Sequence, residues 1–252
     1  MKKQENENLK RAQIELSKLL VEFKKICEKE NLTYYLIGGT LLGAVRHRGF
    51  IPWDDDIDVG MPREDYQKFI KVAPKYLPNG LEVLHYSLDP EYQDYTMKVI
   101  NNNVAYITKQ TNLLVEKKLW IDIFPIDGSP KTNLHKWFHY RKIDFHRMLI
   151  AFHYIKYVRI DPNRNICKRL LVKFAQIIPI GKLIDPNKQK SSIDKELMKY
   201  SPKNSETIGT LMGAYHSKEM VNKKLFGKGS TVSFEGVSYH APASVDLYLR
   251  HI

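Results

Sequence analysis

Apolar residues recur every three or four positions from about residue 9 to residue 30, and this spacing predicts an amphipathic helix that ends near Asn31. A β-rich run over residues 33–39 is closed by two glycines, and residues 40–49 return to a helical pattern. Alternation predicts a strand over residues 54–59, after which Pro62 begins another helix. Further strands are expected at residues 81–86, 96–101, 104–109 and 119–126. The first half of the chain is therefore mixed α and β.

Beyond Gly128 the pattern changes to helices rich in basic and aromatic residues. They are expected at about 133–158 and 165–178, with a shorter helix near 192–198. Residues 231–239 alternate again, as a hairpin strand does. We therefore expect three parts: a core at residues 1–128 that includes the N-terminal helix, a basic helical region at 129–230, and a C-terminal strand element at 231–252 that returns to the core.

The composition is that of a folded globular protein, with 252 residues of which 43% are hydrophobic and 27% charged. With only two cysteines, Cys27 and Cys167, the chain is neither a disulfide-dense secreted scaffold nor a Cys-rich zinc module, and two free buried thiols are expected. No apolar stretch is long enough for a signal-peptide core or a membrane-spanning helix. The expected location is the cytoplasm.

Positive charge is concentrated in one part of the chain. The whole sequence has 40 Lys and Arg against 28 Asp and Glu, a net charge of +12. Residues 129–190 hold 14 of the basic residues against three acidic ones. Such a segment predicts an anionic partner, and two interpretations stand. Either its aromatic and basic side chains contact the inner face of an anionic membrane, or the aromatics form core and the lysines are solvated.

Carboxylates gather on the strand expected at residues 54–59. Asp56 and Asp58 are two apart, so on a strand both side chains point to the same face, and like charges that close repel or require a cation between them. A later apolar strand, WIDIFPIDG, carries Asp122. Because buried carboxylates without a partner are costly, three acids on two strands predict a site for Mg²⁺ or Mn²⁺. A solvated acidic loop is the alternative.

The glycine turn between the first strand and the next helix offers backbone N–H groups that can bind phosphate at a helix N-terminus. The turn lacks the Lys-Ser/Thr ending of a P-loop and the G-x-G-x-x-G spacing of a dinucleotide-binding fold. The argument for phosphate binding therefore depends on the position of the turn ahead of the acidic strands. Two arginines that follow the turn are candidates to pair with phosphate oxygens. The substrate-binding candidates are Gly38, Gly39, Thr40, Arg46, Arg48 and Trp53.

The order of these elements resembles the nucleotidyltransferase fold of the DNA polymerase β superfamily. More closely, residues 38–69, GGTLLGAVRHRGFIPWDDDIDVGMPREDYQKF, resemble the signature of the LicD family, and residues 120–128, WIDIFPIDG, resemble its second motif. The segments FEGVSYHAP and Leu247-Tyr248-Leu249 resemble its C-terminal element. The resemblance spans nearly the whole chain. It implies an α+β fold: a nucleotidyltransferase-like mixed sheet with flanking helices and a basic helical annex.

Members of that family are phosphotransferases that move a phospho-alcohol, best known as phosphocholine from CDP-choline, to a sugar hydroxyl of a surface glycan or teichoic acid precursor. Fukutin-type relatives transfer ribitol phosphate from CDP-ribitol. The resemblance implies a CDP-alcohol donor, a glycan or teichoic acid acceptor that can be lipid-linked, and metal ligation by Asp56, Asp58 and Asp122. Asp122 would also accept the proton of the attacking hydroxyl. The basic helical region would lie on the acceptor or membrane side, and no nucleic-acid partner is expected.

Two other functions would use the same residues differently. A nucleotidyltransferase would move NMP from an NTP to a small molecule or RNA with the same metals, and would release pyrophosphate rather than CMP. A non-catalytic, basic nucleic-acid-binding module is the third hypothesis. The acidic cluster argues against that module, because without metal it would repel a phosphate backbone.

Overall fold

The computed structural model describes residues 2–110, 113–157, 165, 173, 176, 181 and 183–252. These residues form two compact units. One joins Met1–Ser129 to Ser201–Ile252, and the other is Pro130–Tyr200. The second unit is therefore an insertion within the first. Residues 201–230, which the sequence analysis grouped with the basic helices, lie in the first unit instead.

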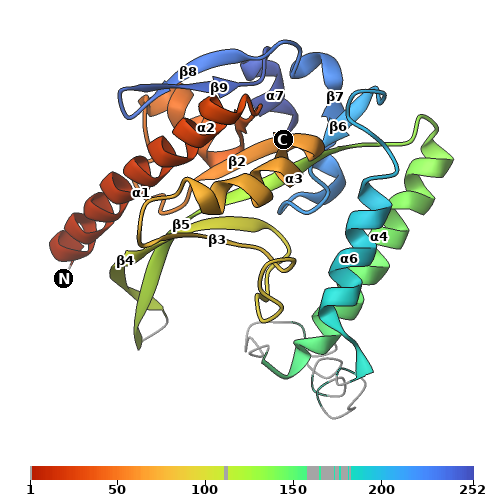
Figure 1. Cartoon of the computed structure of the whole chain (residues 1–252), viewed down its shortest axis with the longest axis horizontal. Coiled ribbons are helices and arrows are strands. Elements are labelled where there is room, and N and C mark those ends of the chain that lie inside the picture. The colour runs from red at the N-terminus through yellow and green to blue at the C-terminus, as the bar shows by residue number, and fades with distance from the viewer. Residues whose placement is uncertain are drawn as a thin grey trace. The chain divides into compact units, whose positions relative to one another are not determined.

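The first unit is built on a mixed sheet of seven strands among the described residues (Figure 1). The main path runs through β1 (Tyr35–Leu36), β2 (Asp58–Pro62), β5 (Leu113–Gly128), β4 (Met97–Gln110) and β3 (Leu81–Leu84). Strands β2 and β5 are parallel, and the other pairs on this path are antiparallel. Near the end of β5 the sheet is extended by β6 (Thr207–Gly209) and β7 (Val221–Asn222). The expected mixture of helices with a mixed sheet is confirmed.

The strands differ from their predicted bounds. Strand β3 ends at Leu84 rather than at 86, and β5 begins at Leu113 rather than at 119. The first strand is only the two residues of β1, because helix α2 (Gly38–His47) already begins at the glycines. The strand expected at residues 54–59 starts only at Asp58, because the N–H of Asp54 closes a turn on the carbonyl of Ile51 at 2.9 Å. The two strands expected at 96–101 and 104–109 are one strand, β4, with a register shift between them.

One face of this sheet carries the hydrophobic core. Phe23 of α1 (Lys2–Glu30) and Phe69 of α3 (Arg63–Val72) meet with ring centroids 5.0 Å apart. Both belong to one buried cluster with Ile121 and Ile123 of β5. Since successive side chains of a strand point to opposite faces, Asp122 lies on the face away from this cluster.

Helix α1 ends at Glu30, as its pattern predicts, and Asn31 takes the left-handed conformation (φ 52°) common after a helix. Cys27 on this helix is buried and free, as expected. Cys167 lies outside the described residues, as does most of the helix expected at 165–178.

The C-terminal tail forms a hairpin of β8 (Ser230–Phe234) and β9 (Val237–Ala241), followed by α7 (Val245–His251). Glu235 and Gly236 both have positive φ, as a tight type I′ hairpin turn requires. The N–H of Glu235 donates to the carbonyl of Arg48 at 2.8 Å, and its carboxylate accepts from the N–H of Phe50 at 3.2 Å. The turn thus holds the loop between α2 and the acidic run.

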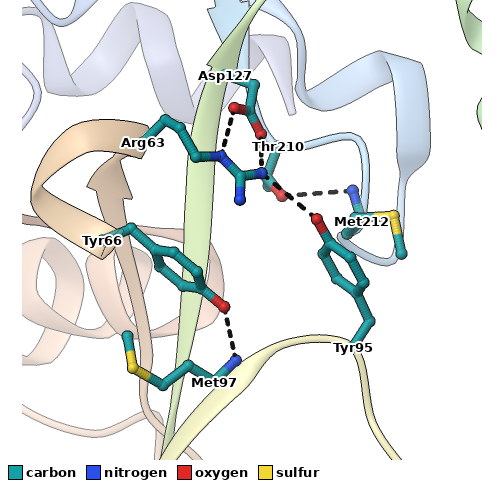
Figure 2. A network of polar contacts seen from close by, with 7 residues as sticks. All are labelled: Arg63, Tyr66, Tyr95, Met97, Asp127, Thr210 and Met212. Carbon is teal, nitrogen blue, oxygen red and sulfur yellow. Dashed lines mark hydrogen bonds and ion pairs between the residues drawn. The ribbon is translucent and has the colours of Figure 1, made fainter. Parts of the chain in front are cut away.

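A buried ion pair joins the start of α3 to the end of β5. The guanidinium of Arg63 donates to both carboxylate oxygens of Asp127, at 2.7 and 2.6 Å, and both side chains are almost fully buried. Figure 2 shows this pair with the hydroxyl of Tyr95 at 3.4 Å from the same guanidinium. Because α3 follows β2 directly, the pair fixes the ends of β2 and β5 beside each other.

The second unit contains the helices α4 (Asn133–His153) and α6 (Pro186–Leu197), which pack against each other. Helix α6 begins earlier than the helix expected near 192–198. Asp185 caps it by accepting from the N–H groups of Asn187 and Lys188, and Pro186 occupies the first helical position. Across the described ranges, neither unit has a helix long and apolar enough to cross a membrane.

Candidate active site

Three charged residues lie in one row across three neighbouring strands. Asp58 of β2 is the register partner of Asp122 on β5, and Asp122 is in turn the partner of Lys98 on β4. Neighbouring strands are about 4.8 Å apart, and residues in one row point to the same face. The predicted association of Asp58 with Asp122 therefore has a geometric basis in the sheet, on the face opposite the apolar core.

The N-terminus of α2 lies beside this row. The hydroxyl of Thr40, in the first turn, accepts the main-chain N–H of Asp58 at 2.8 Å, and the N–H of Ile37 donates to the carbonyl of Asp58 at 3.2 Å. A helix N-terminus carries partial positive charge and unused N–H groups. The structure therefore places the three residues of the glycine turn, Gly38, Gly39 and Thr40, against the first acidic strand.

Both glycines are needed for this close approach. Gly38 has φ of +53°, and a Cβ on it would lie 3.0 Å from Oδ2 of Asp58. A Cβ on Gly39 would lie 3.1 Å from Oδ2 of Asp54. Carboxylates and the helix N-terminus thus face each other with no room for a side chain on either glycine.

The carboxylates of the acidic run repel one another. Burial raises the pKa of Asp58 well above its usual range, and the charges of Asp56, Asp122, Asp54 and Glu219 raise it further. Burial also raises the pKa of Asp54 to about 6, with the charge of Asp56 as the next cause. The site is therefore short of positive charge, which a bound cation would supply.

Asp122 is held by two neighbours that compensate its charge. The indole N–H of Trp120 donates to its Oδ2 at 2.7 Å, and the ammonium of Lys98 lies 3.8 Å from its Oδ1. Burial raises the pKa of Asp122, and both neighbours oppose that rise. Lys98 also forms an ion pair with Asp94 at 2.6 Å and lies over the ring of Trp120, 4.6 Å from its centroid.

The acids suit a hard divalent cation by chemistry, since all the donors are carboxylate oxygens. In the part of the chain that the structure describes, no group of three His, Cys, Asp or Glu residues forms a ready metal-binding cluster. The indole hydrogen bond and the ammonium of Lys98 act on the carboxylate of Asp122, the third predicted ligand. The donor types therefore fit a metal, although the three carboxylates do not form a ready three-residue cluster in the described part of the chain.

The remaining predicted residues come from the loop before β2 and from the C-terminal end of α2. Asp56 precedes β2 in the loop, rather than lying on a strand with Asp58 as predicted, although its charge still acts on Asp58. Trp53, in the same loop, is 78% exposed. Arg46 is in the last turn of α2, about 12 Å along the helix axis from Gly38, and Arg48 caps the helix; both are exposed.

Sequence reasoning missed Lys98, Trp120 and Glu219. Lys98 had a weak signal, because it is a lone charge between apolar residues of a strand. Trp120 is two residues before Asp122 and therefore shares its face, which strand periodicity alone would have shown. Glu219 had no sequence signal: it comes from the segment His216–Glu219, and its carboxylate accepts the N–H of Tyr215 at 2.8 Å.

The sequence is similar to known proteins over the region that contains this site. A family model described as LicD/FKTN/FKRP, nucleotidyltransferase domain, matches residues 31–155, which include the glycine turn and all three acids. The chain is 28% identical over 237 residues to a protein of Haemophilus influenzae described as lipopolysaccharide cholinephosphotransferase LicD. That alignment covers 90% of this chain and 83% of the relative.

Two further similarities are more restricted. Over 40 residues the chain is 50% identical to the ribitol 5-phosphate transferase FKRP of Homo sapiens, which covers 16% of this chain and 8% of that protein. Among solved structures, the small alarmone synthetase 2 of Bacillus subtilis matches with a TM-score of 0.23 and 16% identity, over 75% of this chain and 96% of that one. A TM-score at this level does not establish a shared fold.

Proposed function

Because the chain belongs to the LicD family of phosphotransferases, we propose that it moves a phospho-alcohol, in the first instance phosphocholine, from a CDP-alcohol to a sugar hydroxyl. The acceptor in this proposal is a cell-surface glycan or teichoic acid precursor. The relative that aligns over 83% of its own length is described as a cholinephosphotransferase of lipopolysaccharide, which supports both the phosphocholine group and a glycan acceptor.

The proposal includes a nucleotidyltransferase-like fold for the first unit. The description of the matching family model supports it, as does the order of strand, glycine turn, helix and acidic strands along the chain. The observation that carries the function is the row of Asp58 and Asp122 beside the N-terminus of α2. Such an arrangement could hold a diphosphate between the amide N–H groups on one side and a cation bound by the acids on the other.

In the proposed mechanism, the first turn of α2 binds the diphosphate of the donor. The N–H groups of Gly38, Gly39 and Thr40 would donate to phosphate oxygens, and the helix dipole would favour their negative charge. The hydrogen bond from Asp58 to Thr40 keeps this turn fixed relative to β2. Phosphoryl transfer depends mainly on such alignment, so the rigid turn would contribute directly to the rate.

Asp56, Asp58 and Asp122 are the proposed ligands of Mg²⁺ or Mn²⁺. Once bound, such an ion neutralises phosphate charge and lowers the pKa of the attacking hydroxyl. The mutual repulsion of the carboxylates supports this assignment, because a divalent cation would remove its cost. Trp120 and Lys98 orient the carboxylate of Asp122.

The bonds that change in the proposed reaction can be stated fully. The oxygen of the sugar hydroxyl attacks the phosphorus that carries the alcohol, and a new O–P bond forms. The bond from that phosphorus to the oxygen bridging to CMP breaks, and CMP leaves with the electron pair. The proton of the hydroxyl passes to a carboxylate, for which Asp122 is the candidate, since burial raises its pKa.

Trp53 and the two arginines are proposed to contact the donor outside the diphosphate. The exposed ring of Trp53, in the loop before the acids, is available to stack on the cytosine base. Arg46 and Arg48 are at the far end of α2 from the glycine turn, so their proposed contacts are with a more distant part of a substrate.

A product assay tests the proposal. The purified chain is incubated with Mg²⁺ and, in separate reactions, CDP-choline, CDP-ribitol, CDP-glycerol and CTP, with a mixture of sugar acceptors, and the products are identified by mass spectrometry. We expect CMP and a phospho-alcohol-modified sugar from one CDP-alcohol. Removal of divalent ions with EDTA should stop the reaction, and adding Mg²⁺ back should restore it.

Two variants test whether the acidic site is responsible for the activity, one within the site and one as its control. Asp58→Asn should abolish CMP release, whereas Asp246→Asn, an exposed carboxylate on α7, should leave it unchanged. Release of pyrophosphate from CTP, with no CMP from any CDP-alcohol, would favour the nucleotidyltransferase instead. Unchanged turnover of Asp58→Asn would refute the proposed site even if the chain proved to be a phosphotransferase.

A further inference from the structure

Helix α4 has two apolar faces, and one of them stays exposed among the described residues of its own unit. His139 and Ile143 are buried and lie on one side of the helix, which packs against α6. On the opposite side, five large apolar residues are each between 45% and 65% exposed. We call these residues the outer stripe: Leu134, Trp137, Phe138, Phe145 and Met148.

The spacing of the outer stripe shows that it is one continuous surface. At 100° per residue, four members of the stripe fall within about 40° of the direction opposite Ile143, and the fifth, Trp137, lies about 60° from it. The stripe runs over four turns of the helix. Contiguous exposed apolar surface of this kind on a folded protein marks an interaction site rather than ordinary surface.

The stripe contains a basic residue and belongs to a basic stretch of the sequence. Arg141 lies within the stripe with its side chain 66% exposed, and its guanidinium lies 3.7 Å from the carboxylate of Asp144. In the sequence, residues 129–190 carry 14 basic against three acidic residues. An aromatic and aliphatic stripe with cations beside it is the composition of a helix that lies in the interface of an anionic bilayer. The long side chain of Arg141 can remain in the stripe while its guanidinium reaches lipid phosphate.

We propose that the outer stripe of α4 docks on an anionic lipid bilayer, with the helix parallel to the membrane plane and the rings of Trp137 and Phe138 among the lipid headgroups. None of the stripe residues is among the proposed active-site residues, because the stripe belongs to the inserted unit. Composition favours lipid over protein as the occupant: Trp and Phe beside Arg match an anionic interface, and the excess of basic residues matches its charge.

Flotation with vesicles tests the docking without any substrate, so its outcome is independent of the proposed reaction. The full chain is mixed with vesicles of phosphatidylcholine alone or of phosphatidylcholine with phosphatidylglycerol. We expect binding to the mixed vesicles, weak binding to the neutral ones, and a fall in binding with added salt. The double variant Trp137→Gln/Phe138→Gln should reduce the partition coefficient by at least about tenfold.

A matched control removes two exposed apolar side chains elsewhere. Ile14→Gln/Leu183→Gln replaces residues that are 56% and 88% exposed and lie outside α4, and it should bind vesicles like the wild type. Tryptophan fluorescence locates the contact. The emission should shift to the blue on mixed vesicles, and Trp137→Phe should lose most of that shift while keeping flotation.

Three outcomes would overturn the proposal. The first is absence of flotation with anionic vesicles at low salt. The second is equal loss of binding in the stripe variant and in the matched control. The third is a dimer of the wild type that Trp137→Gln/Phe138→Gln converts to a monomer, which would assign the stripe to a second copy of the chain.

Discussion

Asp58 and Asp122 lie directly opposite each other on the parallel strands β2 and β5, and the N–H of Asp122 donates to the carbonyl of Ile57 at 2.8 Å. Ladder hydrogen bonds therefore set the separation of the main chains of these two residues. Asp56, the third proposed ligand, lies in the loop before β2 and is not held in this way.

Replacement of Asp58 by asparagine should separate function from stability. We expect Asp58→Asn to lower kcat by about a hundredfold or more, because a charged group at the reacting phosphates is lost. The same variant should be at least as stable as the wild type, since it removes a buried charge among like charges. Each kcal/mol added to the free energy of unfolding raises the melting temperature by about 2–4 °C in a chain of this size. Thermal unfolding in EDTA measures this effect.

The stability difference should also depend on pH in a defined direction. Burial and neighbouring carboxylates raise the pKa of Asp58 in the folded state above its value in the unfolded chain. The folded wild type therefore binds the proton more tightly, and its stability relative to Asp58→Asn rises as the pH falls through the folded pKa. The variant's advantage should be largest above the folded pKa of Asp58 and shrink as the pH falls below it. A constant difference between pH 4 and pH 8 would contradict this electrostatic account.

The sequence predicted most residues of this candidate site but not how they are arranged. The residue types and their order indicated Asp58, Asp122 and the glycine turn, because alternation and turn chemistry are local properties. Periodicity could not show that Asp54 closes a turn on Ile51 and thereby delays the strand. The pairing of Lys98 with Asp122 depends on strand register, which is set by the whole sheet.

The fold shows the same limit at a larger scale. Residues 207–209 pair with the end of β5 although the basic insertion separates them in sequence. A two- or three-residue strand such as β6 is too short to give an alternation signal. Residues 201–230 therefore carry no pattern that separates them from the helical region before them. The long periodic helices α1 and α4 were predicted, but α1 begins at Lys2 rather than near residue 9, and α4 ends at His153 rather than at 158.

The hydroxyl of Thr40 should be required for both stability and activity. Thr40→Val keeps the shape of the side chain but leaves the N–H of Asp58 without its acceptor, which costs about 1–3 kcal/mol. Urea unfolding should show that loss, and kcat/KM should fall as the glycine turn loses its connection to β2. Thr40→Ser keeps the hydroxyl and is the control. Equal effects of Ser and Val would show that the hydrogen bond is not the cause.

The absence of a Cβ at Gly38 should matter for activity, in addition to the backbone conformation that glycine allows there. Gly38→Ala introduces a Cβ 3.0 Å from the carboxylate of Asp58 at a residue with φ of +53°. Gly236→Ala has the same kind of φ, +78°, but no atom within 4 Å of its Cβ. Both should lose about 1–2 kcal/mol from backbone strain. Only Gly38→Ala should also lower kcat/KM, and a similar loss of activity in both variants would argue against crowding at the site.

The ion pair of Arg63 with Asp127 should be costly to break from one side. Arg63→Met leaves a buried carboxylate without its partner and should lower the free energy of unfolding by about 3–5 kcal/mol. The double variant Arg63→Met/Asp127→Leu removes both charges and should recover a substantial part of that loss. Chemical denaturation of the four proteins of this cycle gives the coupling energy.

An exposed ion pair supplies the comparison for that cycle. Lys203 and Glu64 also join distant parts of the first unit, but both side chains are more than half exposed. Lys203→Met should change the free energy of unfolding by no more than about 1 kcal/mol. If it cost as much as Arg63→Met, burial would not be the source of the difference.

The interrupted path of the chain through the first unit has a consequence for its synthesis. The ribosome completes β5 before the insertion, yet β6 and the hairpin of β8 and β9, which contacts β1, are made only after it. At roughly 5–20 residues per second, the emerging sheet waits on the order of ten seconds for its last strands. During that interval the edge that β6 later covers is open to other chains. The helices of the insertion can meanwhile form from local contacts alone, so the inserted unit is expected to fold before the unit that contains it.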